Sequence, residues 1–254
     1  MRREGSWDRV SVVSALLAVA ALVGVVLASP TVLPRGVRDL VGLGPDRVAD
    51  AQDPGGAGVY AFLQHQQGNP DDPVGYDPCR RIAVRVNLAH APRDGLEIVQ
   101  EAMRLVEKAS GLRFDYQGQT EDRPHWDREF VPSIFGQVRA SPVLVAWADD
   151  DEVPELEGKV AGVGGSVAVP NGSGYLRYVT GGVTLDAGVF GDLDRGDQGR
   201  EQAVLIAAHE FAHLVGLAHV DDPSELMFSS YVGQPGFGPG DLAGLARVGA
   251  TPCA

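Results

Sequence analysis

Three histidines and one glutamate in a single stretch carry the residue types that bind a metal ion and use it. Residues His209–His219 read H-E-x-x-H-x-x-G-x-x-H. Histidines four residues apart lie on one face of a helix, so the imidazoles of His209 and His213 can reach one ion. Three neutral histidines leave a zinc ion with an open position for water, as in catalytic sites. Glu210, beside the first histidine, is placed to take a proton from that water.

The third histidine can join the other two only if the helix ends. In a continuous helix, His219 would lie about 15 Å along the axis from His209, at about 1.5 Å per residue. The chain must therefore reverse before His219, and Gly216 is the residue that can take the left-handed conformation that ends helices. A core helix that carries histidines by chance is the simpler interpretation. However, a random match to all five fixed positions of the H-E-x-x-H-x-x-G-x-x-H pattern has a probability on the order of 10⁻⁵, which favours a metal site.

The same stretch resembles the matrixin branch of the metzincin clan of zinc endopeptidases, in a bacterial-type version. Matrixins carry H-E-F-x-H-x-x-G-L-x-H, followed by a proline and then by Leu-Met. This chain has matching residues at all of these additional places, namely Phe211, Leu217, Pro223, Leu226 and Met227. The match covers both the metal-binding pattern and the turn that follows it.

The resemblance implies a role for each residue of the site. The three histidines would bind one catalytic zinc ion, and Glu210 would be the catalytic base. Met227 would form the turn beneath the zinc without binding it, although taken alone it would be ordinary core filler. Asp241 stands where matrixins place an aspartate that anchors the last helix. The zinc ligands implied in this way are His209, His213 and His219.

The order of predicted elements agrees with the α+β metzincin fold that the resemblance implies. That fold has a twisted mixed sheet, a backing helix, an active-site helix and a small C-terminal lobe with one helix. Apolar periodicity predicts strands over 82–88 and 112–116, with a helix over 94–110 between them. Further strands are predicted over 142–148, 162–169 and 178–186, and further helices over 198–215 and 240–248.

Two segments of this order bear on function. The glycine-rich segment 162–169 has the composition of an edge strand that opens onto a cleft. In metzincins an edge strand at this place pairs with the substrate backbone, which gives affinity for extended peptide. Phe190–Gly199 is expected to be a loop that leads into the active-site helix.

The first 58 residues are expected to lie outside the catalytic domain, which is assigned to residues 59–254. Basic residues precede Val10–Ala28, a run of 19 residues without a charge. This pattern predicts a signal peptide or a single-pass membrane anchor over residues 1–29, with the N-terminus inside. Residues 30–58 are rich in Pro, Gly and Asp and predict a flexible linker, a stalk or a pro-segment. The cysteine-switch motif of animal matrixins is not found, so that form of latency is not implied.

Composition limits the partners. The net charge of −13 disfavours nucleic acid and anionic membrane surfaces. We expect a monomer that acts on protein or peptide substrates, contacts a membrane only through its N-terminal segment, and is either secreted or anchored at the cell surface.

The chain has two cysteines, Cys79 and Cys253, which flank the expected catalytic domain. An even count in an exported protein favours a disulfide. Such a bridge would stabilise the domain by about 4–5 kcal/mol in the loop-entropy model. A Cys79 thiol that blocks the zinc is the alternative.

Other clusters could suggest further metal sites. The acidic run Asp149–Glu152 could bind calcium, but a solvated loop is the default for such a cluster. The aspartates Asp192, Asp194 and Asp197 resemble part of a calcium loop, but the pattern lacks the glutamate of such a loop, so a solvated loop is favoured there too. His125, next to Trp126 and Asp127, is interpreted as a surface histidine because its spacing does not match the structural zinc site of matrixins.

The sequence therefore predicts a zinc-dependent endopeptidase that hydrolyses extended peptides through a zinc-activated water, with Glu210 as general base. One alternative is a cell-surface binding module that retains the zinc site without turnover, and the intact Glu210 disfavours it. A second alternative is a zinc hydrolase that acts on a non-peptide bond, and the predicted edge strand disfavours that.

Overall fold

The computed structural model describes residues 47–51, 56, 58–125, 133–134, 137–138, 140–195 and 198–253. All of them fall within the unit Arg47–Ala254. The predicted export segment Val10–Ala28 lies outside the described residues, as does most of the predicted linker. Within the described part of the chain, no helix is both long enough and apolar enough to cross a membrane.

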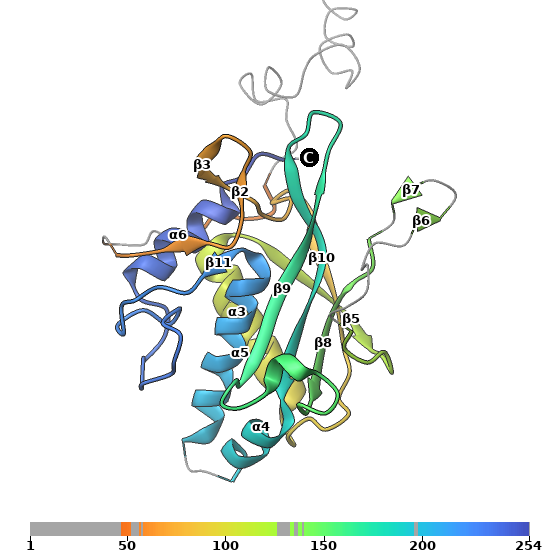
Figure 1. The fold of residues 1–254 in the computed structure, drawn as a ribbon, viewed down its shortest axis with the longest axis vertical. Helices are drawn as coiled ribbons and strands as arrows, with labels where there is room; N and C mark the ends of the chain where they lie inside the picture. The colour runs from red at the N-terminus through yellow and green to blue at the C-terminus, as the bar shows by residue number, and fades with distance from the viewer. Residues whose placement is uncertain are drawn as a thin grey trace, which may run out of the picture. The chain divides into compact units, whose positions relative to one another are not determined.

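The main sheet has five strands (Figure 1). In spatial order they are β5 (Arg113–Gln119), β4 (Arg81–Val86), β8 (Val143–Ala148), β10 (Leu176–Asp186) and β9 (Gly162–Pro170). The first four are parallel, and β9 is antiparallel to β10 at the edge. Every residue of β8 is buried, as expected for a central strand covered on both faces. The predicted strands and the edge position of 162–169 are confirmed.

Two long helices, α3 (Gly95–Ser110) and α5 (Gly199–Val215), lie on one side of this sheet (Figure 1). The backing helix α3 ends at Gly111, which has a φ of 77°. The active-site helix α5 is buried around most of its circumference because it packs against α3 as well as against β9 and β10. Phe211 of α5 contacts Phe114 of β5 with ring centroids 5.4 Å apart. A third helix, α6 (Pro239–Gly249), forms the C-terminal part. The predicted α+β class is therefore confirmed.

A shorter helix, α4 (Ala187–Leu193), replaces the first part of the loop predicted over 190–199. The Asp186 side chain accepts a hydrogen bond from the Val189 N–H at 2.6 Å and so caps the helix. Phe190 is fully buried and contacts the Trp147 ring at 6.3 Å. The loop prediction was wrong here because the glycines and aspartates concealed a cap and one core side chain.

Short strands complete the structure. β1 (Ala61–Phe62) pairs with β11 (Leu217–Ala218), β2 (His65–Gln66) with β3 (Asn69–Pro73), and β6 (Ser133–Ile134) with β7 (Gln137–Val138). A 3₁₀ turn, η1, spans Pro154–Leu156. Of these short strands, β11 lies within the histidine stretch, directly before His219, and β1 pairs with it.

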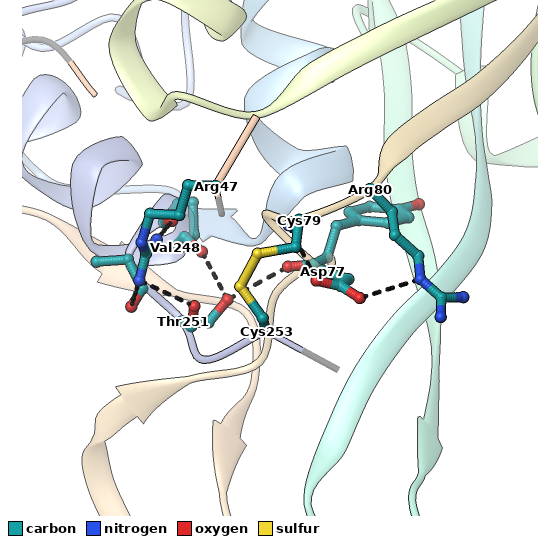
Figure 2. Close-up of a disulfide and its surroundings, with 10 residues drawn as sticks. Arg47, Asp77, Cys79, Arg80, Val248, Thr251 and Cys253 are labelled. Carbon is teal, nitrogen blue, oxygen red and sulfur yellow. Dashed lines mark hydrogen bonds and ion pairs between the residues drawn. A yellow bond between two sulfur atoms is a disulfide. The ribbon is translucent and has the colours of Figure 1, made fainter. Parts of the chain in front are cut away.

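A disulfide joins Cys79 and Cys253, as the sequence analysis predicted, and ties the start of the domain to its end (Figure 2). The backbone around it is also held by hydrogen bonds. The Thr251 hydroxyl donates to Tyr76 O at 3.2 Å, and the Asp77 carboxylate accepts from the Cys79 N–H at 3.0 Å. The Arg47 guanidinium donates to the carbonyls of Gly249 and Ala250 at the end of α6. Reduction of the disulfide therefore removes only one of several interactions that hold the C-terminal residues to the start of the domain.

We predict that replacing both cysteines by serine lowers the free energy of unfolding by about 2–5 kcal/mol, because the unfolded chain regains the freedom that the cross-link removes. Urea unfolding of the wild type and of the Cys79→Ser/Cys253→Ser variant measures the difference. The control is the wild type in the presence of reductant, which should behave like the variant. Alkylation of both thiols in the unreduced wild type would contradict the bridge.

Candidate metal centre

His209 and His213 lie one turn apart on α5, and the backbone orients both of their rings. The Nδ1–H of His209 donates to Leu226 O at 2.7 Å. The Nδ1–H of His213 donates to Leu217 O, also at 2.7 Å. Because each Nδ1 carries a proton, the Nε2 lone pair of each ring is left to bind a metal. Sequence spacing predicted the common face, whereas the two carbonyl partners are visible only in the fold.

The chain reverses at Gly216, as the position of the third histidine required. Gly216 has a φ of 126°, and its N–H donates to Ala212 O at 3.1 Å and to His213 O at 3.0 Å, which closes the last turn of α5. The chain then turns back through β11. His219 thereby returns to the other two histidines, although the helix axis would have carried it away.

The three Nε2 atoms converge on one point. Nε2 of His219 lies 3.0 Å from Nε2 of His209 and 3.1 Å from Nε2 of His213. Two nitrogens that share a tetrahedral zinc ion at about 2.0–2.1 Å are about 3.3 Å apart, which is close to these separations. Among the described residues, these three histidines form a group whose ligand atoms all lie within 4.8 Å of one another. The donor set and its geometry therefore fit zinc.

Burial keeps these imidazoles neutral. It lowers the pKa of His209 to about 4 and that of His213 to about 3, and the neighbouring histidines add to both effects. Burial also lowers the pKa of His219. At neutral pH all three rings are therefore uncharged, which is the form that binds a metal ion.

Glu210 is almost completely enclosed, with 6% of its surface exposed. Burial raises the pKa of its carboxyl to about 8, and a hydrogen bond from the Gly164 backbone partly offsets this. Glu210 directly follows His209 on α5, and its side chain lies against Gly162 of β9. A titratable group with a displaced pKa, next in the helix to a metal-binding histidine, is a candidate for an active site.

The edge strand β9 touches the helix at Glu210, and two glycines make this approach possible. A Cβ on Gly164 would lie 2.0 Å from Glu210 O, and one on Gly162 would lie 2.7 Å from Glu210 Cγ. One turn farther along, the Ser166 hydroxyl donates to Leu214 O at 2.7 Å. The glycine-rich composition of 162–169 is therefore explained by close contact with α5.

The turn around Met227 is fixed to α6 by two buried carboxylates. Asp241 accepts hydrogen bonds from the N–H groups of Leu226 (2.5 Å) and Met227 (3.3 Å), so it anchors the helix to this turn as the resemblance implied. In return, Glu225 accepts from the N–H groups of Gly240 (2.8 Å) and Asp241 (2.9 Å) at the start of α6. Burial raises the pKa of Asp241 to about 6. Sequence reasoning missed Glu225, because a single acidic residue in a turn carries no pattern.

The other candidate groups stay apart from this centre. Within the described part of the chain, the Asp149–Glu152 run contributes Glu152 to an ion pair with Arg123, and Asp192 pairs with Arg195. Asp197, Trp126 and Asp127 lie outside the described residues. The Nδ1–H of His125 donates to Arg123 O at 2.8 Å. Cys79 is in the disulfide, so it does not supply a thiol to the zinc.

Comparison with known families agrees with this centre. The Matrixin family model matches residues 146–241, which include β9, α5 and the turn around Met227. Over these residues the chain resembles the matrixin family of zinc metalloproteases. The match implies zinc as the metal and peptides as the substrates of this matrixin-like protein. A search among curated proteins returns no match.

Two solved structures are similar to this matrixin-like chain. Archaemetzincin from Methanopyrus kandleri is 17% identical, with 66% of this chain and 95% of that chain covered and a TM-score of 0.44. The GM1-bound form of the ECX AB5 holotoxin is 11% identical, with 76% and 90% covered and a TM-score of 0.41.

We predict that Gly216→Ala weakens zinc binding at least tenfold. An alanine would be strained at a φ of 126°, and its Cβ would lie 2.9 Å from Val74 O, so the chain leading to His219 must shift. Zinc affinity measured by competition with a chelator checks this. Gly174→Ala is the matched control, because Gly174 also has a positive φ (83°) but has open space around it. An unchanged zinc affinity in Gly216→Ala would contradict the role assigned to the reversal.

Proposed function

We propose that this protein is an endopeptidase in which His209, His213 and His219 bind one zinc ion and Glu210 is the general base. The observation that carries the proposal is the convergence of three Nε2 atoms on one point, with a buried carboxyl on the next residue of the helix. When bound, a zinc ion supplies a Lewis acid for the scissile carbonyl and lowers the pKa of a water molecule.

The residues of the chain would share the remaining work. The three imidazoles would hold the metal without adding charge, since burial keeps them neutral. Glu210 in its ionised form would take a proton from the attacking water and pass it to the amine that leaves, and a nearby zinc ion would offset the rise in its pKa that burial causes. Its place is fixed by the helix on one side and by β9 on the other. Met227 supports the site through its backbone, which Asp241 holds.

The edge strand supports an extended peptide as the substrate. Among the described strands, none pairs with the outer edge of β9, so another strand can add at this edge. A substrate that adds itself as a strand is recognised mainly through its backbone, with little dependence on sequence. Because β9 lies directly against Glu210, such a peptide would pass beside the proposed base.

We further propose that the protein is exported, and that Val10–Ala28 either anchors it or is removed as a signal peptide. The proposal is based on the basic N-terminal residues and the uncharged run that follows them. Residues 59–254 would then be the catalytic domain on the outer side of the membrane. The linker segment 30–58 would separate that domain from the membrane.

We predict that Glu210→Gln lowers kcat for peptide hydrolysis by about 10²–10⁴-fold, because a general base contributes this much and an amide cannot accept the proton. Zinc content should stay equal to that of the wild type, since Glu210 is not a ligand. Glu201→Gln is the matched control, because Glu201 lies on the same helix but is exposed in its first turn. Turnover near the wild-type level in Glu210→Gln would refute the assignment of the base.

A peptide-library digest tests the substrate class. We expect the zinc-loaded protein to cleave linear peptides at internal bonds, because β9 would bind an extended backbone. A strong chelator should abolish the cleavage and added zinc should restore it. Zinc binding without cleavage of any peptide would favour the non-catalytic binding module. Cleavage of ester or amidase substrates alone would favour a hydrolase of non-peptide bonds.

A further inference from the structure

The short return between α5 and His219 has few local interactions of its own. After Val215 the chain is no longer helical, and only three residues separate the end of the helix from the third histidine. On the far side of His219, the Val220 N–H donates to Met227 O at 3.0 Å, within the same stretch of sequence. On the near side, Leu217 is buried and its carbonyl accepts the hydrogen bond from His213, and a segment distant in the sequence adds to these contacts.

The near side is held by the N-terminal strand of the domain. β1 pairs antiparallel with β11, with Ala61 opposite Ala218 and Phe62 opposite Leu217. The pairing continues into the reversal itself, because the Leu63 N–H donates to Gly216 O at 2.9 Å. All three residues of the return are therefore in register with residues 61–63, which come from the opposite end of the domain's sequence.

The pairing of residues 61–63 with residues 216–218 affects the positions of two of the three histidines, His213 and His219. It fixes the residue directly before His219, and it also fixes Leu217, whose carbonyl accepts the hydrogen bond from His213 Nδ1–H at 2.7 Å. Carbonyl partners of this kind set the orientation and the tautomer of a metal-binding histidine. His219 is the most exposed of the three histidines, so packing constrains it least and the backbone must constrain it more.

β1 is itself packed in place. Tyr60 and Phe62 lie with ring centroids 5.4 Å apart, and Phe62 and His65 with centroids 5.8 Å apart. Gly244 of α6 leaves room for this strand, because a Cβ there would lie 2.9 Å from Tyr60 Cβ and 2.8 Å from Leu217 Cδ2. The strand is therefore held between β11 and α6.

We propose that β1 and Leu63 form a positioning element for the metal site, and that zinc affinity depends on their main-chain pairing with residues 216–218. The proposal rests on the proposed function only in taking zinc as the metal that the three histidines bind. The N-terminal part of the domain thereby has a direct role in zinc binding, because any change that detaches residues 61–63 from residues 216–218 makes the position of His219 less fixed. The contribution comes from the backbone, since the Leu63 side chain is 46% exposed.

The test compares Leu63→Pro with Leu63→Ala in the full chain. Proline removes the N–H that donates to Gly216 O, whereas alanine keeps this N–H and loses only an exposed side chain. We expect zinc Kd, measured by competition with a chelator, to rise about 10-fold or more in Leu63→Pro and less than about 2-fold in Leu63→Ala, since groups that orient the metal-binding histidines contribute about 10–100-fold to metal affinity. Circular dichroism verifies that both variants are folded.

A second variant displaces the strand from its other side, in case Leu63→Pro does not fold. Gly244→Ala should also raise zinc Kd, because the added methyl group crowds Tyr60 and Leu217. Gly191→Ala is its control, as a helical glycine with open space around it. Equal zinc Kd in wild type, Leu63→Pro and Gly244→Ala would overturn the positioning role. Failure of the wild type to bind zinc would instead overturn the proposed function.

Discussion

The reversal of the chain at Gly216 is the constraint on which the rest of the site depends. An α-helix places two imidazoles on one face but carries a third, ten residues on, far along its axis. Convergence therefore requires a backbone conformation that only glycine adopts readily, at a φ of 126°. The cost is that the chain leaves the helix's own hydrogen bonds immediately before a proposed ligand. Contacts from distant segments must replace them.

Those contacts come largely from the main chain and from buried carboxylates. Glu225 and Asp241 are both buried, and each accepts hydrogen bonds from backbone N–H groups that the other's element supplies. Burying an ionisable group without partners is costly, so such groups persist where their oxygens are satisfied. This exchange joins the start of α6 to the turn that also supplies Leu226 O to His209. The start of α6 thus helps to orient a histidine of α5.

The contact between β9 and Glu210 links the proposed chemistry to the proposed substrate. Side chains normally separate the backbone of a strand from a helix that packs on it. At Gly162 and Gly164 there are no side chains, so the backbone of β9 lies directly against α5. The same strand has its other edge free among the described strands. One element therefore encloses the carboxyl and also forms an edge with which no described strand pairs. Glycine composition, which weakens a strand in isolation, here serves both purposes.

The sequence by itself determined the features that repeat over a short range. The histidine spacing, the apolar period of α3, the alternation in β4 and the glycine-rich edge strand all follow from 3.6- and 2-residue periods, which a reader can find without a structure. Tertiary structure alone decided which distant residues support the site. Residues 61–63 and Glu225 carry no periodic signal, because a two-residue strand and a single carboxylate are specified only by the partners that folding brings to them.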